Sequence, residues 1–307
     1  MLRLLIKRLL EAAVVLFGVA LMIFLMLQVV PGNPVTTLMG EHADRAAIAR
    51  MTAELGLDQP LHIQFFRYIT NALRGDFGTS FSLGKPVSVL MGRAFGNTLK
   101  LSALAALFAW ILGILCGIIA AVKKNGLLDH LFMGMSLLGV SMPVFMVAMI
   151  LQYIFAYHLH LLPISGAASL KSFILPAIAL GWNSAGSVAR LVRSDLLEIL
   201  QEDYIDTARA KGLTQLSVLI FHALRNALLP VVTMMALQFS SLLSGAVITE
   251  TVFSINGIGR LAVQAISGRD IPLLEGTALF ATAVVILGNL AADFLYAVLD
   301  PRVGKEA

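Results

Sequence analysis

Six long apolar runs constrain the fold of this chain more than any other feature of its sequence. The first reads AAVVLFGVALMIFLMLQVV and has about the 20 residues that an α-helix needs to cross the hydrocarbon core of a bilayer. Only 13% of the 307 residues are charged, about half the share that is typical of a soluble domain. We therefore predict an all-α integral membrane protein with six transmembrane helices, at residues 10–30, 99–122, 131–157, 174–190, 228–252 and 277–299.

The first run follows MLRLLIKRLL and at first glance resembles a secretory signal sequence. It ends in QVVPGNP, which lacks the small residues of a cleavage site, so we expect it to be retained as the first span. Two later runs contain prolines, Pro143 and Pro176, and the fourth run is interrupted by residues 181–184. Prolines in spans indicate helices that line a cavity, because neighbouring groups or water must satisfy the carbonyls that a proline frees.

Basic residues in the short loops predict the orientation. With the N-terminus in the cytoplasm, twelve Lys and Arg residues fall in the inner segments and three in the short outer loops, as the positive-inside rule requires. Six spans then place both termini in the cytoplasm. These loops also account for the net charge of +4, since no basic cluster interleaved with aromatic residues indicates a nucleic-acid surface.

This topology divides the chain into three parts. Residues 1–30 form an N-terminal tail and the first transmembrane helix, and residues 31–98 form a long extracytoplasmic loop with short helices. Residues 99–307 form a five-helix core that contains a cytoplasmic loop at 190–228.

Two short helices are predicted in the outer loop. One ends at Gly56, and the second runs from near Pro60 to Gly75, because Pro favours helix starts and Gly favours helix ends. The second helix carries apolar residues at helical spacing. They either cap the outer mouth of the protein or dock an extracytoplasmic partner; they are Ile63, Phe66, Ile69, Ala72 and Leu73.

No motif for covalent catalysis or metal binding was found, so we predict no catalytic residue and no metal site. The nearest approach to a phosphate-binding loop is GTSFSLGKP, at 78–86, which has five residues between its glycines and Pro in place of the magnesium-binding Ser or Thr. The six histidines are scattered, and the single cysteine, Cys116, lies in an apolar run. These features disfavour a membrane enzyme.

Two acidic residues, Asp293 and Glu250, are candidates for a role within the membrane. Asp293 lies inside the last span, where a hydrogen bond or salt bridge between helices is favoured over a proton relay. Glu250 ends the fifth span, where we expect it to reach water. So few intramembrane charges argue against a proton-driven transporter that works alone.

The cytoplasmic loop contains a polar segment, DYIDTARAKGLTQLSVLIFHALRN, at 203–226. Acids precede bases in its first half, as a helix dipole favours, and Gly212 then supplies a stop. Thr214 caps a second helix with an apolar stripe formed by Leu213, Leu216, Ile220 and Leu224. Small residues on one flank of the first helix would let another protein approach its backbone closely. They are Thr207, Ala208, Ala210 and Gly212. The residues alone leave open whether this hairpin docks a partner or merely packs on the spans.

The strings DTARAKG and HALRNALLP resemble the EAA loop of ABC importer permeases. They are most similar to the dipeptide/oligopeptide/nickel branch, of which dipeptide permease B-like subunits are members. The similarity covers almost the whole chain and includes VVPGNPV, NTLKLS, SMPVF, ETVFSINGIGRL and GRDIPLLEG in the order of that branch. Asp206 stands where the EAA pattern has Glu, and Thr207 where it has Ala.

The resemblance implies a type I importer permease in the bacterial inner membrane. It implies that the cytoplasmic loop is a coupling helix seated on a separate ATPase, and that ATP and magnesium are bound by that partner, with no cofactor in this chain. A second, related permease subunit, two ATPases, an extracytoplasmic binding protein and membrane lipid are the implied partners. The residues implied to couple to the ATPase are Asp203, Tyr204, Asp206, Thr207, Ala208, Arg209, Ala210, Lys211 and Gly212.

Helix breaks and polar residues within the spans suggest a substrate pathway, although each such group is equally suited to holding helices together. The candidates are Ser141, Pro143, Gln152, Asn183, Gln238 and Ser241. Members resembling this branch import dipeptides, oligopeptides, nickel, metal chelates or glutathione, and di- or oligopeptides are the first expectation. A stand-alone secondary transporter or channel, and a membrane scaffold that transports nothing, are the alternatives from other classes.

Overall fold

The computed structural model describes residues 2–29, 44–243 and 246–299. Within these ranges the regular elements are helices, apart from an isolated bridge between Thr79 and Pro86. The helices are α1 Leu2–Val29, α3 Arg45–Leu55, α4 Leu61–Leu73, α5 Val87–Val122, α6 Leu127–Ser141, α7 Val144–Leu151, the π-helical η1 Gln152–His158, the 3₁₀ turn η2 Leu170–Phe173, α8 Ile174–Ile199, α9 Asp203–Ala210, α10 Gln215–Ser217, the π-helical η3 Val218–Leu224, α11 Arg225–Leu243, α12 Val247–Val252, α13 Ile258–Ser267 and α14 Ile271–Leu299.

Five of the described helical segments are long and apolar enough to cross a membrane, and α6 with α7 and η1 makes a sixth when the two halves are counted as one span. The predicted third span is therefore not one straight helix. Its halves meet at 108°, because Pro143 has no N–H for an intrahelical bond and Met142 is extended, at φ −81° and ψ 131°.

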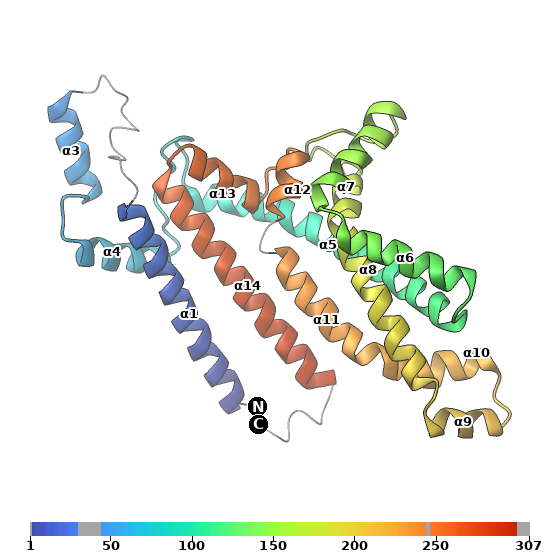
Figure 1. The fold of residues 1–307 in the computed structure, drawn as a ribbon. Coiled ribbons are helices and arrows are strands. Elements are labelled where there is room, and N and C mark those ends of the chain that lie inside the picture. The colour runs from blue at the N-terminus through green and yellow to red at the C-terminus, as the bar shows by residue number, and fades with distance from the viewer. Residues whose placement is uncertain (1, 30–43, 244–245, 300–307) are drawn as a thin grey trace.

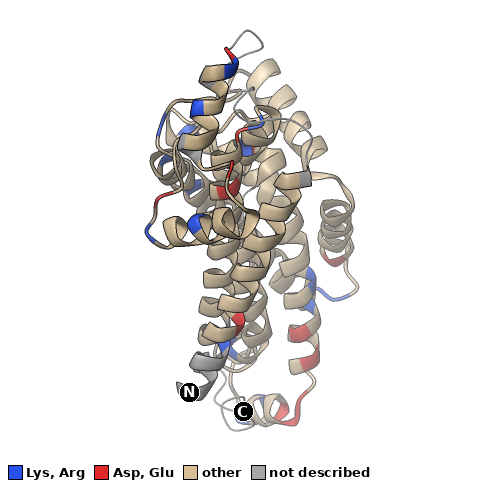
Figure 2. Cartoon of the chain, turned by 90° about the vertical axis from the view of Figure 1, so that its left-hand side faces the viewer, with Lys and Arg blue, Asp and Glu red and all other residues tan. Residues whose placement is uncertain are grey.

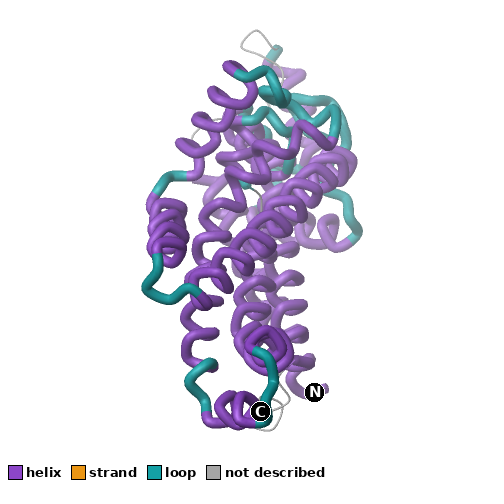
Figure 3. The backbone as a smooth tube through the Cα atoms, turned by 90° about the vertical axis from the view of Figure 1, so that its right-hand side faces the viewer, coloured by secondary structure: helices purple, strands orange, loops and turns teal. Residues whose placement is uncertain are grey.

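The elements lie between two ends of the molecule. The start of α1, the end of α14 and the short helix α9 lie at one end, and α3, α12 and α13 lie at the other (Figure 1). Short connections join the helices in Figure 3, and Figure 2 shows that the central helices are almost free of charged residues. This arrangement matches the prediction that both termini and the 190–228 loop share one side.

Two predicted span boundaries were wrong. Helix α5 begins at Val87, twelve residues before the apolar run that signalled it. The predicted span 228–252 is divided, since α11 ends at Leu243 and α12 is a separate helix from Val247. In contrast, α8 runs unbroken through the polar interruption at 181–184.

Glycines set the spacing of the central helices. A Cβ at Gly117 would lie 2.7 Å from the Ala189 carbonyl oxygen, and one at Gly113 would lie 2.8 Å from that of Ala185. Gly113 and Gly117 thus form a GxxxG pair that brings the backbones of α5 and α8 into contact, as small residues do in membranes. Gly181 and Gly186 on α8 lie equally close to α5 and α6.

The two predicted outer helices are confirmed. Helix α3 ends at Leu55, followed by Gly56 at φ +68°, and α4 begins after Pro60. Of the two alternatives for the apolar side of α4, the packed cap is not what the structure shows. Phe65 and Tyr68 pack on α1, whereas Phe66 and Leu73 are 73% and 83% exposed.

The buried carboxylate of Glu250 connects α12 to α5 and α13. Glu250 does not reach water as expected; it is fully buried and accepts hydrogen bonds from the Thr98 hydroxyl at 2.7 Å and the Arg260 N–H at 3.0 Å. Thr98 also accepts from the Ile258 N–H, so the pair caps the start of α13. Burial raises the pKa of the Glu250 carboxyl, and its hydrogen bonds act in the opposite direction.

The loop that superficially resembles a phosphate-binding loop has a structural role here. The Ser80 and Ser82 hydroxyls and the Ser82 N–H donate to one Asp270 carboxylate oxygen at 2.6, 2.7 and 2.9 Å. Burial acts to raise the pKa of Asp270, but these bonds and one from the Phe81 backbone outweigh it, so the pKa is lowered. The carboxylate ties the start of α5 to the start of α14.

Candidate functional site

The candidate site is α9, the short helix between the ends of α8 and α10. Asp203 and Asp206 lie in its first turn and Arg209 in its last, as predicted from the helix dipole. The Arg209 guanidinium pairs with Asp206 at 2.8 Å on the exposed surface. A second contact closes the hairpin, because the Asn226 side chain donates to the Tyr204 hydroxyl at 2.9 Å.

Two residues, one helical turn apart, fix α9 to the rest of the chain. Ile205 is fully buried and Ala208 is 6% exposed. They pack with Ala121 of α5, Leu196 of α8 and a group from η3 and α11, namely Val218, Ala223 and Ala227. Helix α9 therefore rests on the ends of three long helical segments at once.

The opposite side of α9 is exposed in the part of the chain that the structure describes. Asp203, Asp206, Thr207 and Ala210 are exposed and share one face by their helical spacing. This face carries two carboxylates and two small side chains. Of the nine residues expected to couple to a partner, Ala208 points into the protein, while the other eight are exposed. The flank of small residues that a partner could approach thus consists of Thr207, Ala210 and Gly212, and Ala208 is not part of it.

The turn after α9 has the predicted geometry. Gly212 adopts φ +81°, a left-handed conformation that suits glycine, and the Thr214 side chain accepts from the Ser217 N–H at 3.3 Å. The second helix differs from the prediction, since it continues without interruption through η3 into α11. Most of its predicted apolar stripe is exposed: Leu213, Leu216 and Ile220 are 41%, 66% and 45% exposed, while Leu224 is partly buried.

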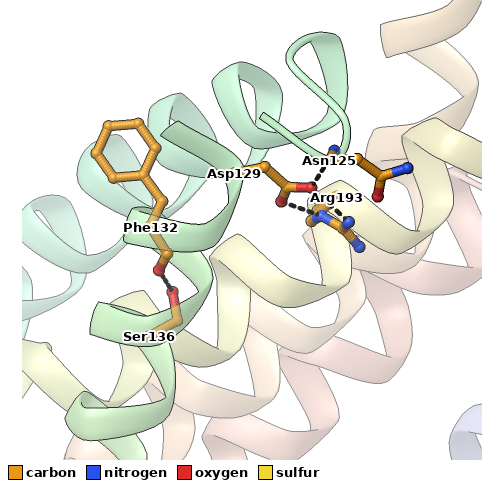
Figure 4. Close-up of polar contacts among 5 residues, drawn as sticks. All are labelled: Asn125, Asp129, Phe132, Ser136 and Arg193. Carbon is orange, nitrogen blue, oxygen red and sulfur yellow. Dashed lines mark hydrogen bonds and ion pairs between the residues drawn. The ribbon is translucent and has the colours of Figure 1, made fainter. Parts of the chain in front are cut away.

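A buried ion pair lies close to this end of α8. Asp129 accepts from Arg193 Nε at 2.6 Å and from a terminal nitrogen at 2.7 Å (Figure 4). The Asn125 N–H donates to the same carboxylate at 2.9 Å. The pair joins α6 to α8 about 9 Å before α8 ends at Ile199. The sequence offered Arg193 only as one of the inner basic residues and gave no sign of its partner, 64 positions away.

Five of the six pathway candidates are distributed over α6, η1, α8 and α11, and Pro143 lies in the break between α6 and α7. Gln152 donates to the carbonyls of Ile164 and Val252, and Asn183 donates to the Val140 carbonyl beside the break of α6. These two side chains therefore hold backbone segments together. Ser141 and Pro143 are exposed at the break, and Gln238 Oε1 is buried with no hydrogen-bond partner. Ser241 is exposed on α11. The side chain of Asp293 lies outside the described residues.

Comparison with protein families identifies this arrangement. Residues 113–305 match the binding-protein-dependent transport system inner membrane component, and residues 1–106 match the N-terminal membrane component of such systems. The chain belongs to this family. As a binding-protein-dependent transport component, it is a multi-pass inner-membrane permease of an ABC importer.

Relatives of known name align with this permease over almost its full length. It is 43% identical over 303 residues to the glutathione transport system permease protein GsiC of Salmonella paratyphi A, covering 99% of both chains. Identity to GsiC of Escherichia coli strain K12 is 42% over the same length. Predictions of the family and of its dipeptide/oligopeptide/nickel branch are confirmed.

Solved structures support the fold. A chain of the MetNI methionine ABC transporter, in an inward-facing conformation, superimposes with a TM-score of 0.59 at 19% sequence identity. The match covers 69% of this permease and 96% of that chain. The type I importer permease fold is therefore confirmed.

Proposed function

We propose that this permease forms half of the membrane pathway of an ATP-driven importer for short peptides, glutathione among them. The observation that carries this proposal is the 43% identity to a glutathione permease over 99% of both chains. Glutathione is itself a tripeptide, so the proposal unites the expected peptide substrates with the substrate named for the relatives.

The importer would contain a second, related permease, two cytoplasmic ATPases that bind ATP and magnesium, and an extracytoplasmic binding protein. Helix α9 would be the ATPase contact, because its exposed face carries carboxylates and small side chains and its buried face rests on α5, α8 and α11. ATP binding closes the ATPase pair and moves α9. The attached helices then turn the pathway from inward-facing to outward-facing, a two-state change driven by differential affinity.

Reconstitution tests this function. The full importer, encoded with its neighbouring subunits, is placed in liposomes, and uptake of radiolabelled glutathione and a dipeptide is measured with and without ATP and binding protein. Uptake of at least one of them that needs both is the expected result. Transport by this chain alone contradicts the importer role, whereas ATP-driven import of nickel but of neither peptide overturns only the substrate.

A further inference from the structure

Helix α4 lies against a membrane span rather than above it. The Phe65 ring meets Phe17 and Phe24 of α1 at centroid distances of 5.6 and 5.3 Å, and Tyr68 stacks on Phe24 at 6.5 Å. Both α1 residues belong to the membrane-crossing segment Arg8–Gln28. In Figure 1, α4 crosses beside the upper part of α1 instead of running along it.

The depth of α4 follows from the position of these contacts along α1. Phe24 and Phe17 precede the end of the span at Gln28 by about 6 Å and about 16 Å at 1.5 Å per residue. Half of a bilayer's hydrocarbon core is about 15 Å thick. Of the contacts between α4 and α1, the one at Phe24 thus lies within the outer half of the membrane and the one at Phe17 lies near its midplane.

The side of α4 that faces away from α1 carries large exposed apolar side chains. Phe66 is 73%, Leu73 83% and Ile63 43% exposed. The Thr70 hydroxyl on this side donates to the carbonyls of Phe66 and Arg67 at 2.9 and 3.0 Å, as hydrocarbon surroundings require. The exposed His62, in the first turn of the helix, is the polar side chain beside Phe66, so the face is predominantly rather than wholly apolar.

Polar groups of α4 gather on its other edge. The Gln64 side chain donates to the carbonyls of Leu57 and Gln59 at 3.2 and 2.7 Å, and the Arg67 guanidinium lies against Gly56. The loop that leads down from α3 covers this edge. One side of α4 is thus held by polar contacts to the outer loop, and the opposite side is exposed and predominantly apolar.

We propose that α4 is an interfacial membrane helix whose Ile63, Phe66 and Leu73 side chains enter the acyl chains of the outer leaflet. Lipid is the occupant because α4 packs on a membrane span whose side chains around the Phe24 contact are themselves apolar and exposed, Met22 at 58% and Met26 at 62%. An amphipathic helix with one polar edge and one apolar face lies in a bilayer in this way. The inference rests on the membrane topology and is independent of the substrate.

Spin-label accessibility tests this placement. Single cysteines replace Phe66, Leu73 or Arg67 in a Cys116→Ala background, and the full chain is expressed with its partner subunits in native membrane vesicles. Val14→Cys on the lipid-facing side of α1 is the bilayer reference, and Arg74→Cys at the end of α4 is the aqueous reference. Collision rates with oxygen and with a water-soluble nickel chelate are measured at each site.

Labels at positions 66 and 73 should behave like the label at position 14, with a ratio of oxygen to nickel collisions several-fold above that at 67 and 74. A ratio like that at 74 would overturn the proposal in favour of a face that docks an aqueous protein. Low accessibility to both reagents would overturn it in favour of burial beneath another subunit. Phe66 and Leu73 are tested separately, so loss of one variant leaves the other decisive.

Discussion

Asp129 and Arg193 form a bidentate ion pair that binds α6 to α8 at the end of the molecule where α9 lies. The Asp129 side chain is 2% exposed and that of Arg193 is 27% exposed, so each charge depends on the other for its solvation. Removing one partner of a buried pair costs about 3–5 kcal/mol, because the remaining charge stays buried.

We predict that Arg193→Ala destabilises the permease by an amount of that order and lowers its thermal midpoint in detergent. Asp129→Ala should cost less, since the Arg193 side chain that remains can reach water more easily. The exposed pair of Asp206 and Arg209 is the matched control, and Arg209→Ala should change stability by no more than about 1 kcal/mol. Equal midpoints for Arg193→Ala and Arg209→Ala would contradict this account of the pair.

Glycine packing between α5 and α8 makes a second prediction. Gly117→Ala should destabilise the protein by about 1–3 kcal/mol, the usual cost of overpacking, because its new methyl would lie 2.7 Å from the Ala189 carbonyl oxygen. Gly96→Ala on the same helix is the control, since nothing lies within 4 Å of a Cβ there. Helix propensity makes that change neutral or stabilising. Thermal unfolding of both variants measures the difference, which must have this sign for the packing argument to stand.

Local signals were predicted well from the sequence. The ends of α3 and α4 follow from Gly56, Pro60 and Gly75, and the turn after α9 follows from Gly212. The hydrophobic runs located the membrane segments, but hydropathy reports contact with lipid rather than helix length. It therefore missed the first twelve residues of α5, which extend outside the apolar run.

Contacts between distant residues were not predictable from one sequence. Glu250 meets Thr98 across 152 positions, and Asp129 meets Arg193 across 64. The side from which α9 is approached also depends on tertiary packing, so the small residue Ala208 was assigned to the partner surface although it packs inward. Pro143 indicated a break in the third span, but the 108° angle between its halves depends on how the neighbouring helices pack.

The stability of the protein should depend on pH through Asp270. Its pKa is lowered from the ordinary value of 3.8 by its hydrogen bonds, so the folded state binds this proton less tightly than the unfolded state. The stabilisation it supplies is complete above about pH 4 and declines as the pH falls through the lowered pKa. Asp270→Asn should therefore lower the thermal midpoint at pH 7, and its deficit against wild type should shrink as the pH falls from 5 towards 3.

Asp76→Asn is the control for that titration, because Asp76 is exposed and the hydrogen bond that it accepts from the Gly78 N–H at 2.9 Å is one that Asn retains. It should track wild type throughout. A deficit for Asp270→Asn that stays constant down to pH 3 would show that the carboxylate does not act through its charge.

Gly212 tests the turn after α9. Its φ of +81° costs a β-branched residue roughly 1–3 kcal/mol, whereas Asn tolerates this region. Gly212→Val should reduce ATP-dependent uptake with normal amounts in the membrane, and Gly212→Asn should retain most of it. Uptake assays with immunoblots of the membrane fraction distinguish the two, and full uptake by Gly212→Val would refute a role for the turn.

The most direct test of the central claim is photo-crosslinking from the exposed face of α9 in the working importer. A photoreactive phenylalanine derivative is placed at Thr207 or Ala210, with Val14 on α1 as the control position, and the adducts are identified by mass spectrometry. The account predicts ATPase adducts from 207 and 210, with yields that change on ATP binding, and none from 14. Adducts only within this chain, in an importer that still transports, would contradict it.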